Sequence, residues 1–133
     1  MSETKLIRVS DAMTPTVRTI EAMASIKDAI RLMRENRVSS LVVERRNDAD
    51  EYGLITVTEI AREVIATNRS IERVNVYEVM VKPVLSLPAE MQVKYGVRLL
   101  VRYGLSRALV IDQARHPVGI VTLRDLVLHA EPV

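Results

Sequence analysis

The sequence contains the same seven-residue pattern twice, at residues 53–59 and 119–125. The first copy reads Gly-Leu-Ile-Thr-Val-Thr-Glu and the second reads Gly-Ile-Val-Thr-Leu-Arg-Asp. The offset between these copies is 66 residues, and at an offset of 67 the 32 residues from Met13 match those from Met80 at 8 positions. A single one-residue gap therefore aligns the two halves. Because an internal repeat constrains a fold more than any single motif does, we expect two copies of one folding unit.

The length of the chain favours two small units that support each other. The chain has 133 residues, which leaves each copy about 60 residues, a size at which the buried surface barely offsets the lost conformational entropy. The two copies are therefore expected to pack against one another. We assign the first repeat to residues 9–67, a linker to residues 68–75 and the second repeat to residues 76–130.

Within each repeat, an apolar pattern with helical spacing lies between short runs rich in β-branched residues. Ser25 and Asp28 form a plausible capping pair for the first of these helices, and Gly104 is placed to end its counterpart in the second repeat. The expected strands are residues 16–20, 41–43 and 54–57, then 84–87, 108–111 and 118–122, and the closing helices are residues 58–66 and 123–130.

This order of elements predicts an α+β fold made of two β-α-β-β-α repeats. A strand that returns through a helix to a neighbouring parallel strand crosses over with a right hand, so the helices should cover one side of each small sheet. Two such sheets packed about a pseudo-two-fold axis would create two clefts. Each cleft would be lined by both repeats.

The charge balance and the apolar pattern restrict the possible partners. Lysine and arginine number 19 against 17 acidic residues, a net charge of +2 that is spread along the chain and disfavours nucleic acid as a partner. The first residues lack the apolar core of a signal peptide, and no run of about 18 apolar residues predicts a membrane span. We expect a cytoplasmic protein without membrane contact.

The residues that commonly carry catalysis are scarce. There is no cysteine, which excludes thiolate chemistry and a cysteine-ligated zinc site. The two histidines, His116 and His129, have no carboxylate at metal-ligand spacing and no nucleophile suited to a triad. A phosphate-binding loop of the Gly-x-x-x-x-Gly-Lys type is also missing. We expect neither an enzyme nor a metal site.

The two Gly-to-acid segments, together with the Val38–Val43 and Leu105–Asp112 runs, resemble the cystathionine-β-synthase (CBS) domain family. The resemblance covers residues 9–129 as a tandem pair, or Bateman module. It implies a regulatory, non-catalytic module that binds adenosine-containing ligands in its clefts. In that family the acid holds the ribose hydroxyls, and the threonine or serine supports ribose or phosphate. AMP, ADP or ATP is the favoured ligand, with S-adenosylmethionine or NAD as further possibilities and no required cofactor.

Carried over residue by residue, the resemblance gives two unequal clefts. The second copy has Asp125 in the family's acidic position and Arg107 as a candidate for phosphate, whereas the first copy has Glu59 and Ser40 there. The stronger cleft would comprise Thr16, Val17, Val38, Ser39, Ser106, Arg107, Ile120, Thr122 and Asp125. The weaker cleft would comprise Ser40, Leu54, Thr56, Glu59, Pro83, Val84 and Leu105. Lys82 could replace the missing guanidinium, but a solvated lysine is the favoured interpretation.

Purely structural roles compete with these assignments. Thr-x-x-Glu and Thr-x-x-Asp are also capping boxes, so Thr56 and Glu59 fit either role, while ligand binding is favoured for Thr122 and Asp125. Apolar residues that could enclose an adenine could equally belong to the core. The resemblance further implies a homodimer that acts on an unknown effector protein in trans. A dimeric adaptor that binds no ligand is the alternative.

Overall fold

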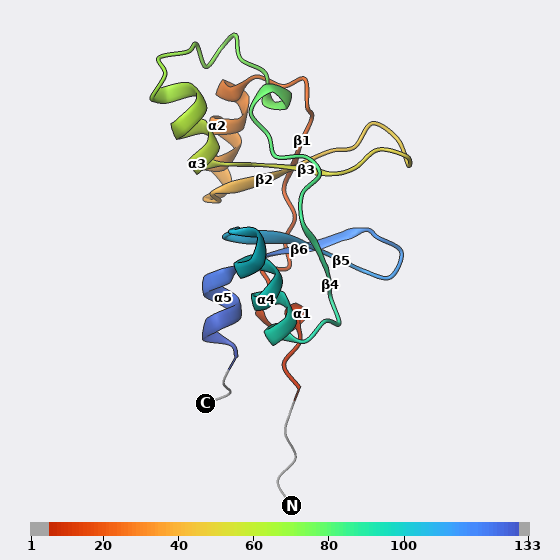
Figure 1. Ribbon diagram of the computed structural model, residues 1–133. Helices are drawn as coiled ribbons and strands as arrows, with labels where there is room; N and C mark the ends of the chain where they lie inside the picture. Colours follow the sequence, from red (N-terminus) through yellow and green to blue (C-terminus); the bar gives the residue numbers. More distant parts are fainter. Residues whose placement is uncertain (1–5, 131–133) are drawn as a thin grey trace, which may run out of the picture. The chain divides into compact units, whose positions relative to one another are not determined.

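The computed structural model describes residues 6–130, which form two compact units (Figure 1). The contiguous unit consists of residues 18–84. The composite unit combines residues 6–17 with residues 85–130. The units therefore do not coincide with the two sequence repeats, because the residues ahead of each repeat's first strand belong to the unit of the other repeat.

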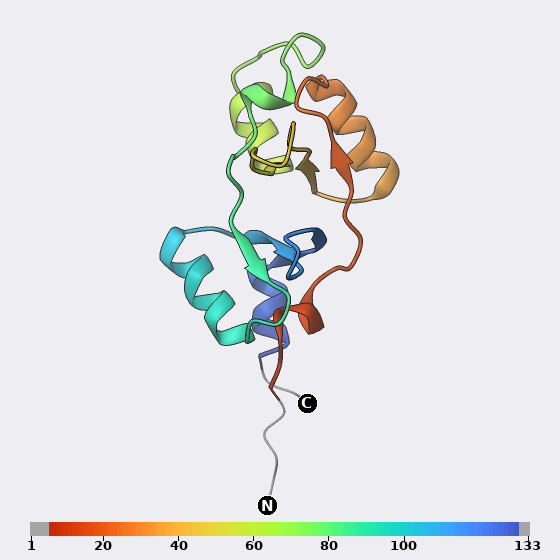
Figure 2. The same cartoon turned by 90° about the vertical axis from the view of Figure 1, so that its right-hand side faces the viewer.

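The contiguous unit is built on a three-stranded sheet. Strands β1 (Thr19–Ile20) and β2 (Ser40–Val43) are parallel, and β2 pairs antiparallel with β3 (Gly53–Thr56), in the order β1-β2-β3. Helix α2 (Ile26–Asn36) lies beside β1 in Figure 2 and connects the two parallel strands. After β3 the chain continues through α3 (Val57–Ile60), the π-helix η1 (Ala61–Ile65) and the 3-10 helix η2 (Val76–Glu78).

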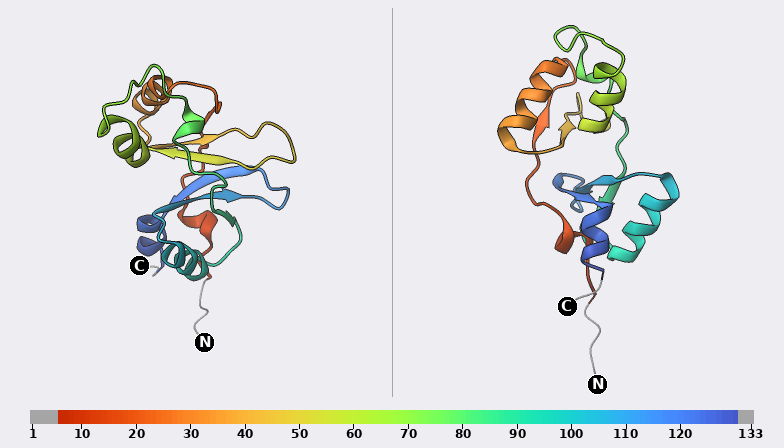
Figure 3. Two further views of the ribbon diagram at one scale, coloured as in Figure 1. Left: turned by 45° about the horizontal axis from the view of Figure 1, so that its top comes forward. Right: turned by 90° about the vertical axis from the view of Figure 1, so that its left-hand side faces the viewer.

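The composite unit repeats the same topology. Strand β4 (Ser86–Pro88) is parallel to β5 (Arg107–Ile111), and β5 pairs antiparallel with β6 (Pro117–Thr122). Helix α4 (Val93–Tyr103) joins the parallel pair and contacts the closing helix α5 (Leu123–Leu128), while the short helix α1 (Val9–Ala12) packs on both. In each unit the hairpin between the antiparallel strands extends away from that unit's helices (Figure 3). The predicted α+β fold with two β-α-β-β-α repeats is confirmed.

Local capping explains where the longer helices begin and end. The Asp28 N–H donates a 3.1 Å hydrogen bond to Ser25 Oγ, and the Ser25 N–H donates to the Asp28 carboxylate, so α2 begins with the predicted capping box. Helix α4 ends at Gly104, whose φ of 63° is left-handed. Arg37 ends α2 in the same conformation, with a φ of 54°. The glycine stop was predicted, whereas the arginine stop carries no sequence signal.

Several expected strand limits differ from the structure. Residues 16–18 precede β1, which is restricted to Thr19–Ile20 by its pairing with Val42 and Val43. Strand β4 begins at Ser86, two residues later than expected. Val57, expected at the end of a strand, is the first residue of α3 because Thr56 already caps that helix.

Each unit has its own aliphatic core. Ile26, Leu41 and Ile55 are fully buried in the contiguous unit, and Leu87 and Leu126 are fully buried in the composite unit. Val74 and Val76, at the end of the expected linker and just beyond it, are also buried in the core of the contiguous unit. This stretch is therefore a packed part of the unit.

The segments ahead of each repeat's first strand, around Thr14 and around Val81, lie in the unit of the other repeat, and we call them the exchanged segments. Each one pairs with the sheet of the unit that it joins. In the composite unit, Thr14 and Ile120 exchange two backbone hydrogen bonds of 2.8 and 3.0 Å. In the contiguous unit, Leu54 and Val81 exchange bonds of 2.9 and 2.8 Å. Thr14 and Val81 are equivalent positions of the sequence repeat, so the exchange is reciprocal.

The two repeat glycines allow these segments to approach. A Cβ on Gly119 would lie 2.6 Å from both Met13 Sδ and the Thr14 carbonyl oxygen. A Cβ on Gly53 would lie 3.0 Å from Met80 Sδ and 3.2 Å from the Val81 carbonyl oxygen. The glycine that opens each repeated pattern therefore makes room for a neighbouring segment, and the approach is closer at Gly119 than at Gly53.

Candidate functional site

The junction between β6 and α5 places Thr122 and Asp125 in one turn. Thr122 is the N-cap of α5, and its Oγ1 accepts a 3.0 Å hydrogen bond from the Asp125 N–H. Both residues are half-buried. The capping role of Thr122 fixes the backbone of the turn, which sets the position from which the Asp125 side chain extends.

The Asp125 carboxylate differs in its contacts from its counterpart in the other repeat. Within residues 6–130, no hydrogen bond or salt bridge to the Asp125 carboxylate is formed. The cap of α5 is therefore one-sided: the threonine serves the helix, and the acid does not reach back to the N-cap. This leaves the oxygens of a carboxyl group available as acceptors at the strand-to-helix junction.

Ser106 and Arg107 flank this turn on the adjacent strand. The Ser106 carbonyl oxygen accepts a 2.8 Å hydrogen bond from the Leu123 N–H, and Arg107 is the register partner of Thr122 in the β5–β6 pair. The structure thus brings together Ser106, Arg107, Thr122 and Asp125, as the sequence predicted. Arg107 is half-buried, with its Nε atom inside the protein, so it is not a freely solvated surface arginine.

The N-terminal segment reaches the same sheet. Ile120, half-buried on β6, is the residue that pairs with Thr14, and Thr16 and Val17 follow two and three residues later. Thr16 is exposed and Val17 is half-buried. Seven of the nine residues predicted for the stronger cleft therefore belong to the composite unit, while Val38 and Ser39 belong to the contiguous unit.

At the junction between β3 and α3, Thr56 and Glu59 form hydrogen bonds with each other. The Thr56 hydroxyl donates a 2.7 Å hydrogen bond to Glu59 Oε1, and the Thr56 N–H donates a 3.1 Å bond to the same oxygen. The Glu59 N–H in turn lies 3.4 Å from Thr56 Oγ1. Thr56 is buried, with 7% of its surface exposed. Both residues act here as a complete capping box.

The other residues of the predicted weaker cleft are distributed around this junction. Ser40 is buried and is the register partner of Thr56, and Leu54 is buried on β3. The Val84 N–H donates a 3.0 Å hydrogen bond to the Tyr52 carbonyl oxygen, which places Pro83 and Val84 beside the start of β3. The remaining residue, Leu105, belongs to the composite unit.

Lys82 is held by a carboxylate on the β2–β3 hairpin. Its Nζ lies 2.8 Å from Asp50 Oδ1, and Arg46 Nε lies 3.3 Å from Asp50 Oδ2. These contacts hold the pKa of the Asp50 carboxyl well below its usual range, and the hydrogen bond from Lys82 has the largest effect. Lys82 therefore has a structural partner in Asp50.

The sequence analysis missed Thr14 and Val81, the two residues that anchor the exchanged segments. Their signal was available, because they occupy equivalent positions at the offset of 67 residues that aligns Met13 with Met80.

Among residues 6–130 there is no cluster of three or more histidine, aspartate or glutamate side chains that could hold a metal ion. In the same part of the chain, no helix has the length and apolar character of a membrane span.

Comparison with known proteins agrees with this architecture. The CBS domain family matches residues 9–66 and 76–131, so most of the chain is covered by two tandem matches. The chain belongs to the CBS domain family. Tandem CBS domains are typically regulatory.

Individual relatives share the repeats but are longer. An uncharacterized protein of Methanopyrus kandleri is 30% identical over 100 residues, which are 75% of this chain and 50% of that protein. The glycine betaine/carnitine/choline transport ATP-binding protein of Bacillus subtilis is 31% identical over 121 residues, which are 90% of this chain and 30% of that protein. The chain therefore spans half or less of the length of these relatives.

Among solved structures, the hexameric CBS-CP12 protein from bloom-forming cyanobacteria superposes with a TM-score of 0.89 at 34% identity. The match covers 93% of this chain and 68% of that chain. The similarity extends through both repeats and supports the assignment of the fold.

Proposed function

We propose that the protein is a regulatory module that binds adenosine-containing ligands through the β6–α5 junction. AMP, ADP and ATP are the favoured ligands. The observation that carries this proposal is the contrast between the two acids of the repeat: Glu59 is engaged by Thr56, whereas the Asp125 carboxylate accepts no hydrogen bond within residues 6–130.

The chemistry of a ribose fits this arrangement. A ribose presents two neighbouring hydroxyl groups, and an ionised carboxylate can accept a charge-assisted hydrogen bond from each of them. Asp125 is half-buried beside the capping residue Thr122, so its backbone is already ordered before a ligand arrives. An ordered acceptor loses less conformational entropy on binding than a flexible one does.

Arg107 is the group proposed to recognise phosphate. It is the register partner of Thr122 in the β5–β6 pair, and its guanidinium offers forked donors that match phosphate oxygens. The equivalent position in the first repeat is Ser40, which is buried. The two junctions should therefore differ in both ribose and phosphate recognition.

A related fold is known to accommodate such a ligand. The CBS domain of a bacterial CNNM/CorC family Mg²⁺ transporter has been solved in complex with ATP, and it shares this fold with a TM-score of 0.75 at 24% identity. S-adenosylmethionine and NAD contain the same adenosine group and remain candidates. They belong in any screen for the ligand.

The proposed output is a change in interaction with another protein. A ligand that binds one conformation of the module better than another shifts its population, and an effector protein in trans or a second copy of the chain could respond to that shift. We propose a homodimer in the cytoplasm as the working form. Exposed apolar side chains on α4 and α5, such as Val101, Val127 and Leu128, are available for association.

Isothermal titration calorimetry with AMP, ADP, ATP, NAD and S-adenosylmethionine tests the proposal. At least one of these should bind, and Asp125→Ala should weaken that binding by about tenfold or more, since it removes charge-assisted hydrogen bonds. Glu59→Ala is the matched control in the other repeat and should change affinity less. Absence of binding by all five compounds at millimolar concentration, or the reverse order of the two variants, contradicts the proposal.

A further inference from the structure

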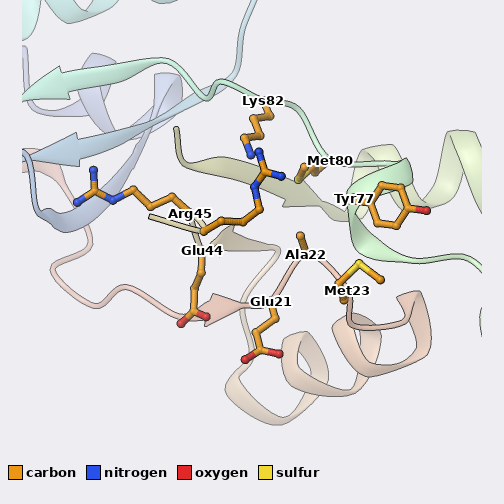
Figure 4. Close-up of a pocket in the computed structure, with 9 residues that line it drawn as sticks. Glu21, Ala22, Met23, Glu44, Arg45, Tyr77, Met80 and Lys82 are labelled. Carbon is orange, nitrogen blue, oxygen red and sulfur yellow. The ribbon is translucent and has the colours of Figure 1, made fainter. Parts of the chain in front are cut away.

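The contiguous unit contains an open pocket at the end of its sheet opposite the β3–α3 junction. The pocket has a volume of about 590 Å³, and all the residues that line it fall within residues 18–84 (Figure 4). Its acidic residues, Glu21 and Glu44, directly follow β1 and β2. The strand register pairs Val43 with Gly53 and Ser40 with Thr56, so the pocket and Thr56 lie at opposite ends of β2 and β3. A volume of this size suits a small organic molecule.

One wall of the pocket is apolar. It is formed by Ala22, Met23, Tyr77 and Met80, and Figure 4 shows the last three side chains grouped together. Met23 is 71% exposed and Tyr77 is 49% exposed, which is high for large apolar side chains of a folded unit. A methionine pair and an aromatic ring form an adaptable surface that can pack against an aliphatic group and attract a cation.

Two carboxylates lie side by side on another wall. Ile20 and Val43 are register partners, and the Glu44 N–H donates a 2.9 Å hydrogen bond to the Ile20 carbonyl oxygen, so Glu21 and Glu44 extend from adjacent strand ends. The Thr19 hydroxyl donates a 3.1 Å hydrogen bond to Glu44. Within residues 6–130, neither carboxylate forms a salt bridge.

The basic residues of the pocket are already opposed by other carboxylates. Arg45 pairs with Asp48 at 3.5 Å and lies over the Tyr52 ring, while Arg46 and Lys82 share Asp50. Because Lys82 and Arg46 lower the pKa of the Asp50 carboxyl, Asp50 stays ionised at neutral pH and offsets one of these two positive charges. With Asp48 and Asp50 counted, four carboxylates face three cations, so Glu21 and Glu44 leave this region with one net negative charge.

We propose that this pocket binds a small organic cation. Its ammonium group would lie against Glu21 and Glu44, and its aliphatic part would pack on Met23, Met80 and the Tyr77 ring. Two adjacent carboxylates repel each other, and an ammonium group placed between them relieves that repulsion and donates a hydrogen bond to each. The site is separate from the proposed adenosine site, so each can fail without the other.

The test uses the whole chain labelled with ¹³C at the methionine methyl groups. Titration with hexylamine should give saturable chemical-shift changes at Met23 and Met80, because both line the pocket. Met13 and Met91, which belong to the composite unit, serve as internal references and should not respond. Hexanoate has the same chain length and the opposite charge, so it cannot donate hydrogen bonds to Glu21 and Glu44. It should bind at least tenfold more weakly than hexylamine, a difference of about 1.4 kcal/mol or more.

Variants establish which groups provide the affinity. Glu21→Gln with Glu44→Gln should lower the affinity for hexylamine by about tenfold. Glu35→Gln, an exposed acid on α2 that does not line the pocket, is the matched control and should leave the affinity unchanged. The methyl signal of Met33, which is buried in the core of the contiguous unit, reports whether each variant is folded.

Three results overturn the proposal. The first is the absence of saturable shifts at Met23 and Met80. The second is binding of hexanoate as tight as that of hexylamine, which would make Arg46 and Lys82 the recognising groups. The third is equal loss of affinity in the Glu35→Gln control, which would reveal only a general attraction between the cation and the protein.

Discussion

The Thr56 hydroxyl donates a 2.7 Å hydrogen bond to Glu59, and this contact gives the acid of the first repeat a defined structural role. Glu59→Ala removes the returning half of a capping box and should destabilise the protein by about 1 kcal/mol. Asp125→Ala should cost less stability, because the Asp125 carboxylate makes no comparable contact within residues 6–130. Urea denaturation followed by circular dichroism measures both.

The alanine variants of Glu59 and Asp125 should therefore rank in opposite orders when stability and nucleotide affinity are measured. Glu59→Ala should be the more destabilised variant, and Asp125→Ala should be the variant with the larger loss of nucleotide affinity. A single order in both measurements would mean that the two junctions differ only in stability and not in role. That outcome would remove the distinction on which the adenosine site is proposed.

Gly119→Ala should destabilise the composite unit by about 1–3 kcal/mol, the usual cost of forcing extra volume into a packed site. The added methyl would lie 2.6 Å from the Thr14 carbonyl oxygen, a backbone atom that cannot move without disturbing its pairing with Ile120. Gly53→Ala is the repeat-matched control and should cost less, since its nearest neighbour at 3.0 Å is the end of the flexible Met80 side chain. Equal costs for the two variants in thermal unfolding would contradict this explanation.

Asp50→Asn should lower stability at pH 7, and the difference from the wild type should shrink in acid. Lys82 and Arg46 lower the pKa of Asp50 in the folded state, so the stabilisation is complete above its unfolded pKa of about 4 and is lost as the pH falls below that value. Chemical denaturation of both proteins at a series of pH values between 7 and 3 measures the difference. A difference that stays constant below pH 4 would argue against the charge pair as its source.

Val76→Ala should destabilise the contiguous unit by about 1–3 kcal/mol, as deletion of buried methyl groups does. Val76 is fully buried in that core, although it lies next to the segment that the sequence marks as a linker. Val101→Ala on α4 provides the exposed control, because 65% of Val101 is accessible to solvent. Similar melting temperatures for the two variants would show that the segment around Val76 is a passive connection.

Local signals in the sequence account for most of the secondary structure. Ser25 with Asp28, and Gly104, mark helix limits because caps depend on residues within one turn of the chain. The β-branched runs identified the strands that pair antiparallel in both units for the same reason. Arg37 was not foreseen as a helix stop, since its left-handed conformation is imposed by the path of the chain into β2.

The parts that could not be predicted depend on residues far apart in the chain. The pairing of Thr14 with Ile120 joins segments that are separated by most of the sequence, and no local pattern specifies it. The contact between Asp50 and Lys82 is likewise a product of the exchanged segment. For the candidate site, the sequence showed that Glu59 and Asp125 could either bind a ligand or cap a helix. Only the structure shows that the Glu59 carboxylate accepts hydrogen bonds from Thr56.

The composite unit also sets an order of events during synthesis. Residues 18–84 form one continuous segment that is synthesised before residues 85–130, so the contiguous unit can fold without waiting for the rest of the composite unit. The segment around Val9 and Thr14 is made before residues 18–84 but must wait for β6 and α4, its partners in the composite unit. This segment therefore precedes the contiguous unit in synthesis but can reach its final place only after that unit has been made.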